Sequence, residues 1–332
     1  MSKTLVFICV AAVLVAAALP ASAITIRNDR KQQLYLDLGA LPQYASVGRI
    51  DEKTAGSAYI GSGTLIDQDW VLTAAHMVDD ATALTFTIGG NTYAAAKDQW
   101  FFYPSWTGDL LAGYDIGLVK LETPVTTVAP AVRYTGSAEF GTVGTMVGFG
   151  MTGTGKTGAK TFDGQKRGGQ NMIDSYVGKL ATAARILLVD FDSGKKNDNR
   201  YGLAAPLNLE GLIAPGDSGG GLFIGDGAAA RLAGVTSFIG AFDGRTDSDY
   251  GDVGGFTRVS AFNSWIDSYV PSWINDTIST ISSRLGAPLA ELSLGADGAV
   301  AVIPEPASLA LLVLGLGAIA ARRRCAPDKS GG

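Results

Sequence analysis

Three residue types in this chain have the chemistry needed to break an acyl bond. His76, the single histidine of the sequence, ends an apolar run that starts at Trp70. Asp115 stands at the head of another apolar run, and Ser218 lies in the glycine-rich stretch 215–220. An imidazole takes up and returns a proton near neutral pH, a serine hydroxyl needs such a base to become a nucleophile, and a carboxylate orients the imidazole. Together they predict nucleophilic catalysis, although each alone is compatible with a core histidine, a turn serine or a strand-start aspartate.

Short strands separated by turn residues are the elements that must position these side chains. Residues 84–94 alternate apolar and polar side chains around a Gly-Gly-Asn turn, which predicts a β-hairpin. Further candidate strands lie at 116–121, 142–149, 186–191 and 232–238. Because strand and helix patterns do not alternate, we expect an antiparallel barrel or sandwich rather than a doubly wound sheet.

Helical spacing of apolar residues occurs only late in the chain. Residues 260–269 carry it, with Ser260 as the expected N-cap and Pro271 as the stop, and residues 274–285 predict a second short amphipathic helix.

Composition bounds the possible function classes. The 332 residues include 44 glycines and only 17% charged residues, which suits short strands and tight turns and argues against a coiled coil or general disorder. The formal net charge is −5, without the excess of basic residues typical of nucleic-acid-binding proteins, so nucleic acid is not an expected partner.

Both ends of the chain carry apolar segments. Residues 1–23 contain Lys3, an apolar run and a final Ala-Ser-Ala, which predicts a secretory signal peptide cleaved after Ala23 rather than a permanent membrane helix. Residues 307–321 are apolar and precede three arginines, which predicts a short membrane helix with its end held in the cytoplasm. Cys9 and Cys325 are the only cysteines, so the body at 24–303 has no disulfide and depends on core burial for stability.

The residues around the candidate site resemble the trypsin/chymotrypsin family of serine proteases. Residues 73–76 (Thr-Ala-Ala-His), 115–118 (Asp-Ile-Gly-Leu) and 216–220 (Gly-Asp-Ser-Gly-Gly) match the family's three motifs in the family's order. The similarity runs from about residue 45 to about residue 270. Its departures are Met77 and Ala214, where the family usually has cysteines, and Gly221, where it usually has proline.

This resemblance implies an all-β, chymotrypsin-like fold of two packed antiparallel six-stranded β-barrels with a C-terminal helix. The protease domain would cover 24–285, with the first barrel at about 24–130, the second at about 131–270, and the closing helices at about 260–285. The implied function is a serine endopeptidase that hydrolyses protein or peptide substrates through an acyl-enzyme, without a metal or cofactor. A non-catalytic cell-surface or matrix-binding protein on the same scaffold is the alternative.

The resemblance also implies roles for individual residues. His76 would be the general base, Asp115 its orienting partner and Ser218 the nucleophile. The amides of Gly216 and Ser218 would form the oxyanion hole. The substrate backbone would pair with the segment that holds Ser237, Phe238 and Gly240.

Specificity rests on the residue six positions before the serine, which the resemblance places at the floor of the primary pocket. Leu212 occupies that position, and predicts small or medium apolar substrate side chains. If the alignment with the family were shifted by two positions, Glu210 would lie at the pocket floor, and the expected preference would change to basic substrate side chains. The acidic stretch 243–252 is expected to be a solvated turn, with a pocket-side loop or a calcium loop as alternatives.

The C-terminus resembles a PEP-CTERM sorting signal. Pro304-Glu305-Pro306 precedes the apolar run and the arginines within 303–332, and a Gly-, Ala- and Pro-containing stretch at 286–302 is expected to be a spacer. The resemblance implies a Gram-negative host, processing by signal peptidase and an exosortase, and a location in the periplasm, at the cell surface or in the extracellular matrix. An ordinary C-terminal anchor is the alternative.

Family members are often activated when a new N-terminal isoleucine pairs with the aspartate before the catalytic serine, here Asp217. Cleavage after Ala23 would expose Ile24, whereas Ile50 leaves too little chain before His76. We therefore predict that export itself activates the enzyme. The alternative is that Ile24 frays and local amides hold Asp217.

Residues 150–157 match the phosphate-binding pattern G-x-x-x-x-G-K-[ST]. That loop needs a following helix, and residues 158–164 have no helical period, so we interpret the segment as a flexible loop.

Overall fold

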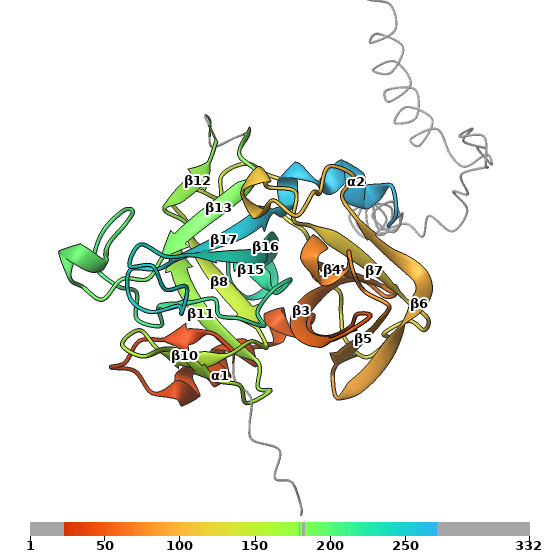
Figure 1. Cartoon of the computed structure of the whole chain (residues 1–332), viewed down its shortest axis with the longest axis horizontal. Helices are drawn as coiled ribbons and strands as arrows, with labels where there is room; N and C mark the ends of the chain where they lie inside the picture. Colours follow the sequence, from red (N-terminus) through yellow and green to blue (C-terminus); the bar gives the residue numbers. More distant parts are fainter. Residues whose placement is uncertain (1–22, 179, 181–182, 271–332) are drawn as a thin grey trace, which may run out of the picture. The chain divides into compact units, whose positions relative to one another are not determined.

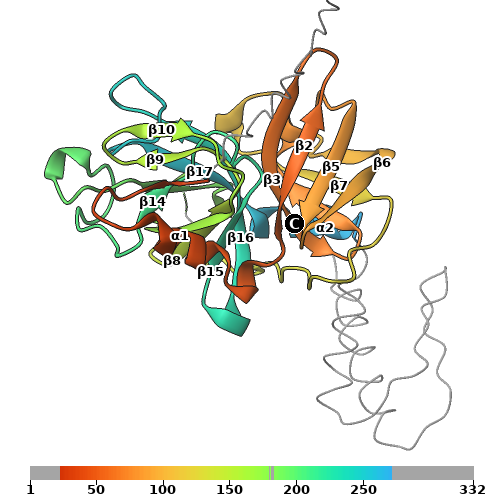
Figure 2. The same cartoon turned by 90° about the horizontal axis from the view of Figure 1, so that it is seen from below.

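A closed six-stranded barrel forms the first half of the body. The computed structural model describes residues 23–178, 180 and 183–270. The barrel's strand order is β2-β3-β4-β7-β6-β5, and it is drawn in orange to yellow in Figures 1 and 2. Its strands are β2 (Val47–Lys53), β3 (Ala58–Asp67), β4 (Trp70–Thr73), β5 (Ala83–Ile88), β6 (Asn91–Phe102) and β7 (Gly117–Leu121). The six-stranded prediction is confirmed for this half.

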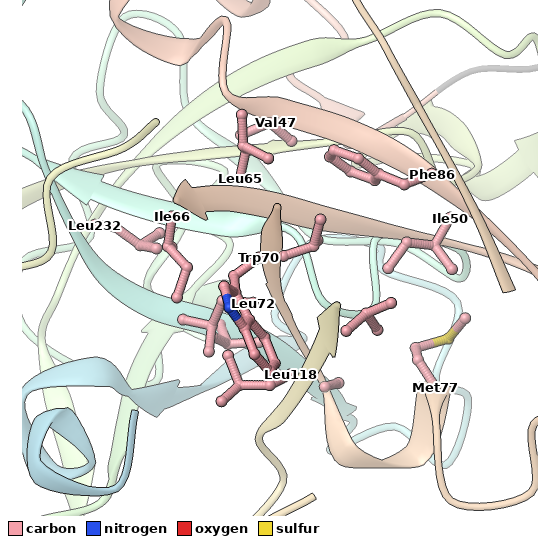
Figure 3. Close-up of a cluster of buried hydrophobic side chains, with 14 of the residues drawn as sticks. Val47, Ile50, Leu65, Ile66, Trp70, Leu72, Met77, Phe86, Leu118 and Leu232 are labelled. Carbon is pink, nitrogen blue, oxygen red and sulfur yellow. The ribbon is translucent and has the colours of Figure 1, made fainter. Parts of the chain in front are cut away.

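The predicted hairpin is the β5–β6 pair. Gly89 and Gly90 both have positive φ angles, as a tight two-residue hairpin turn requires, and Ile88 pairs directly with Asn91. Alternate side chains of the strands fill the barrel, and Figure 3 shows Phe86 and Ile50 among them. Met77 follows His76 on the short turn shown in the same view.

The second half is a seven-stranded sheet in the order β11-β8-β15-β16-β17-β13-β12. Its strands are β8 (Val143–Gly148), β11 (Arg167–Met172), β12 (Ser175–Val177), β13 (Ile186–Asp190), β15 (Gly221–Ile224), β16 (Arg231–Gly240) and β17 (Val253–Arg258). The sheet is barrel-like, as expected for the second half, but it stays open and has seven strands where six were predicted. The Asn171 side chain of β11 donates to the carbonyl of Asp190 on β13 at 2.7 Å, so a side chain bridges these strands where a backbone ladder would close the barrel.

A smaller sheet of four short strands lies in the order β10-β9-β1-β14. These are β1 (Thr25–Ile26), β9 (Thr152–Thr154), β10 (Gly158–Thr161) and β14 (Gly211–Leu212). Strand β9 lies within residues 150–157, which match the phosphate-binding pattern, and forms a hairpin with β10, which follows them. The next element along the chain is β11, so the helix that a phosphate-binding loop needs does not follow, and a hairpin takes the place of the flexible loop that was expected.

Helices are few, and one was not predicted. Helix α1 (Gln32–Gly39) packs against β11, and helix α2 (Asn263–Asp267) closes the body. The predicted cap at Ser260 is wrong, because α2 starts at Asn263 and the Ser260 hydroxyl instead donates to Glu139 Oε1 at 2.7 Å.

Several predicted segments lie outside the described residues. They are the bulk of the signal peptide (1–22), the second helix (274–285), the spacer (286–302) and the sorting signal with its apolar run (303–332). Within residues 23–270, apart from three undescribed positions, no helix combines the length and apolar character needed to cross a membrane.

Candidate active site

His76 and Asp115 meet at the edge of the first barrel. His76 sits on the single turn Ala75–Met77 that directly follows β4, and Asp115 precedes β7, the strand paired with β4. The His76 Nδ1 lies 2.8 Å from Asp115 Oδ2, and the His76 backbone amide donates to Oδ1 at 3.0 Å. The carboxylate thus fixes both the ring and the backbone of the histidine.

The second sheet holds Asp115 from the other side. Asp115 is fully buried, and Ser237 Oγ on β16 donates to its Oδ2 at 2.6 Å. Thr257 Oγ1 on β17 donates to the Asp115 backbone carbonyl at 2.7 Å. Sequence reasoning assigned Ser237 to a substrate-binding strand and missed this contact, which depends on the packing of one half of the body on the other.

Ser218 lies on the tight turn between β14 and β15, facing the first barrel. Its carbonyl accepts from the Ser62 amide on β3 at 2.8 Å, and the next amide, Gly219, donates to Thr236 on β16 at 2.8 Å. Gly219 has φ of +80°, and a Cβ there would collide with the Thr73 hydroxyl on β4. The turn therefore needs glycine at position 219. It lies between the two halves of the body and contacts β4, the strand that precedes His76.

The amides proposed for an oxyanion hole have their hydrogens available. Gly216 has φ of +92°, and among the described residues neither the Gly216 nor the Ser218 amide donates a hydrogen bond. Free donors on a fixed turn are what stabilises a developing oxyanion. The Asp217 amide between them instead donates to Ala214 at 2.9 Å, which holds the turn in shape.

The charges around His76 raise the pKa of its imidazole. Partial burial lowers its pKa, but the hydrogen bond and the charge of Asp115 raise it more, and the charges of Asp79 and Glu52 add to the increase. The resulting pKa lies above the usual 6.5. Burial, with the charge of Asp79, raises the pKa of Glu52 to about 7. No local pattern in the sequence indicated that Glu52 would lie near the histidine.

Ile24 reaches the aspartate before the candidate nucleophile. Its backbone nitrogen donates to Asp217 Oδ2 at 3.2 Å, and the amides of Ala214 and Gly150 donate to the same carboxylate at 2.8 Å each. Ile24 is fully buried in the uncleaved chain, and local amides also hold Asp217, as the alternative expected. Ile50 lies inside β2 and pairs with β3 and β5, which excludes it as a new terminus.

Leu212 and Glu210, the residues assigned to specificity, lie in or next to β14, shortly before the turn that carries Ser218. Leu212 is fully buried in β14, and a Cβ on Gly254 of β17 would lie 3.1 Å from its side chain. Ile239 on β16 packs against the same apolar cluster. Glu210 is buried, and its two carboxylate oxygens accept from the amides of Asp192 at 2.7 Å and Leu207 at 2.5 Å.

Apolar contact fills one of the places where the family usually has a cysteine. A Cβ on Gly61 of β3 would lie 2.6 Å from the Met77 methyl, so the methionine occupies the space beside this glycine. Met77 is buried in the core of the first barrel.

Comparison with known proteins agrees with this geometry. A family model described as Trypsin matches residues 45–266, and one described as PEP-CTERM protein-sorting motif matches residues 302–324. The chain is 30% identical over 230 residues to human chymotrypsin-like elastase family member 1, covering 66% of this chain and 85% of that protein. It is 29% identical to the dog protein of the same name, covering 63% and 81%, and 26% identical to brachyurin of Leptuca pugilator, covering 63% and 87%.

Solved structures show the same fold. A structure titled HL collagenase superposes with a TM-score of 0.52 at 19% identity, covering 70% of this chain and 97% of that one. Neuropsin, a serine protease of mouse brain, superposes with a TM-score of 0.51 at 18% identity, covering 70% and 98%. With the family model spanning most of the described body, the chain belongs to the trypsin family, and it is a serine endopeptidase that carries a PEP-CTERM sorting motif.

Proposed function

We propose that this protein is an exported endopeptidase that cleaves peptide bonds with a triad of Ser218, His76 and Asp115. The observation that carries the proposal is the clamped His76–Asp115 pair, since a buried carboxylate at 2.8 Å sets the tautomer and orientation a general base needs. Ser218 attacks the carbonyl carbon, His76 takes its proton and returns it to the leaving amine, and water then releases the acyl group. The Gly216 and Ser218 amides bind the oxyanion.

The primary pocket is proposed to accept small or medium apolar side chains. Leu212 supplies its floor, and Ile239 packs against the same cluster beside the substrate strand that contains Ser237, Phe238 and Gly240. Glu210 does not favour a basic preference, because both of its oxygens are already hydrogen bonded to backbone amides.

A peptide-library digestion tests the proposal directly. The exported protein is compared with its Ser218→Ala variant, and cleavage sites are read by mass spectrometry. We expect cleavage after alanine, valine and similar residues in the first sample only. Cleavage after lysine or arginine would overturn the pocket assignment while leaving catalysis intact.

Activity should depend on the protonation of His76. We expect kcat/KM to fall as pH decreases through the pKa of His76, with a midpoint above 6.5, because only the neutral imidazole acts as a base. The direction follows from the raised pKa, which keeps the inactive imidazolium present at higher pH. A pH profile from 5 to 9 measures this, and a rate unchanged from pH 8 to pH 5 contradicts the role.

The sorting motif supports export, and we propose that the chain is processed by signal peptidase and an exosortase after brief attachment through its C-terminal helix. Its destination would be the periplasm, cell surface or extracellular matrix. Replacing Pro304, Glu305 and Pro306 by alanine should abolish C-terminal processing in a host that has the exosortase, without loss of proteolysis. Immunoblotting of cell fractions measures it, and normal processing of the variant would refute the sorting role.

A further inference from the structure

Two buried carboxylates lie at the end of β13. Asp190 ends the strand, Asp192 follows two residues later, and the charge of Asp190 acts on the Asp192 carboxyl. Asp190 is 1% exposed and Asp192 is 4% exposed. In the described part of the chain, the Oδ1 atom of each is buried and has no hydrogen-bond partner. Burying an unpaired carboxylate oxygen is costly, so this arrangement calls for a missing partner.

The loop that follows folds back over these carboxylates. Asp190 Oδ2 accepts from the amides of Arg200 at 2.5 Å and Tyr201 at 2.9 Å, which pins the end of the loop beside its start. Asn199 also has a buried amide atom without a partner. Three of the nine such buried atoms found in the described residues therefore fall within residues 190–199.

Negative charge accumulates at this place, and the charge of Arg200 offsets part of that of Asp190. Burial raises the pKa of Asp192 to about 7, and the charges of Asp190, Asp174 and Asp198 contribute to that rise. Across the residues that the structure describes, no lysine or arginine forms an ion pair with any of these four carboxylates. Arg200, whose charge acts on Asp190, donates from Nε to the carbonyl of Gly251 at 3.1 Å instead of pairing with a carboxylate.

We propose that Asp190 and Asp192 bind a calcium ion under the 191–200 loop, with the Asn199 carboxamide oxygen as a further ligand. The donors are all oxygen and include two carboxylates, which is the set that calcium prefers. Rotating the Asn199 amide by half a turn presents its oxygen without moving the backbone. This site departs from the expectation of no metal, which rested on sequence motifs alone.

A second acidic cluster provides the contrast. Asp247, Asp249 and Asp252 have carboxylate oxygens within 4.8 Å of one another. Arg245 pairs with Asp249 at 3.2 Å and with Asp247 at 3.7 Å, so part of that charge is already balanced by the protein. Because Asp247 Oδ1 is also buried without a hydrogen-bond partner among the described residues, this cluster is the competing site that the experiment must distinguish from the proposed one.

The ion would stabilise the segment that supports the active site. Asn171 donates to the Asp190 carbonyl at 2.7 Å and to the Gly211 carbonyl at 3.0 Å, and Glu210 accepts from the Asp192 amide. Both links lead to β14, which pairs with β1 and contains Leu212. In a body without disulfides, calcium at this place joins β13, the long loop and β14.

Calcium binding is measured by calorimetry on the full chain in mild detergent, with Ser218→Ala present throughout to prevent self-cleavage. After treatment with EDTA, calcium chloride is titrated, and magnesium chloride serves as the comparison. We expect one calcium per chain, with a Kd of about 10⁻³ M or tighter, and at least roughly tenfold weaker binding in Asp192→Asn. Asp249→Asn should bind like its parent.

Thermal unfolding of the same proteins separates a binding role from a structural one. Without calcium, Asp192→Asn should melt higher than its parent, because it removes an unpaired buried charge. With calcium the order should reverse, because only the parent binds the ion. Absence of binding at several millimolar calcium, unaltered binding in Asp192→Asn, or loss of binding in Asp249→Asn would each overturn the assignment.

Discussion

Replacement of Ser218 by alanine is expected to lower kcat for peptide cleavage by roughly 10⁶-fold. The hydroxyl is the proposed nucleophile, and the turn that carries it is held by backbone contacts, namely Ser218 carbonyl to Ser62 and Gly219 amide to Thr236. The variant should therefore keep its fold and melting temperature. Cleavage of a chromogenic peptide with a small apolar residue at the cleavage site, followed with the purified exported protein, measures the change.

Two further variants make this result specific. Ser105→Ala changes an exposed serine and should leave the rate unaltered. His76→Ala should lose about as much activity as Ser218→Ala, and the double variant little more, because nucleophile and base act as one unit. Full activity in purified Ser218→Ala would refute the assignment of the catalytic triad. A folded parent protein that cleaves nothing in the library, with Ile24 verified as its first residue, would favour the binding-protein alternative.

The triad motifs could be found from sequence because each is short and continuous. Thr73 of the His76 motif ends β4, and the glycines beside Ser218 make the turn, so local residues determine local structure. The strand positions could be predicted for the same reason. In the β5–β6 hairpin, the alternation of apolar and polar residues and the two turn glycines lie within about a dozen residues.

The features that sequence reasoning missed depend on pairing between distant segments. Ser237 contacts Asp115 from 122 residues away, and Asn171 bridges β13 and β14 through one side chain. Glu52 comes near His76 only because β2 closes the barrel. No local sequence pattern predicts any of these contacts. The same is true of the open edge of the second sheet, where the Asn171 side chain, and not a backbone hydrogen-bond ladder, links β11 to β13.

Extending the N-terminus is the second change with a large expected effect. Insertion of Met-Gly between Ala23 and Ile24 leaves signal-peptide cleavage in place but prevents a free ammonium on Ile24. We expect kcat/KM to fall by roughly 10²- to 10⁴-fold, the equivalent of the ~3–5 kcal/mol typical for losing one partner of a buried ion pair. Mass spectrometry of the exported protein confirms which residue comes first, and the peptide assay gives the rate.

The structure with an intact Ala23–Ile24 bond gives the physical reason. Ile24 has φ of +60°, a region that strains a β-branched residue, and burial raises the pKa of Asp217 to about 7 despite three amide donors. Cleavage removes the φ constraint and places a positive charge 3.2 Å from the carboxylate, so it relieves both costs.

The same reasoning supplies a control and a pH signature. Ile24→Val keeps the ammonium and nearly the same packing, so it should retain most of the activity. With Ile24 first, activity should fall at alkaline pH as the ammonium loses its proton, at a pKa above the usual ~8 because the carboxylate favours the charged form. The Met-Gly form, which has no ammonium at that position, should lack this alkaline limb. Equal rates for the extended and natural forms, with the same alkaline profile, would show that export does not activate the enzyme and that the three amides alone hold Asp217 in place.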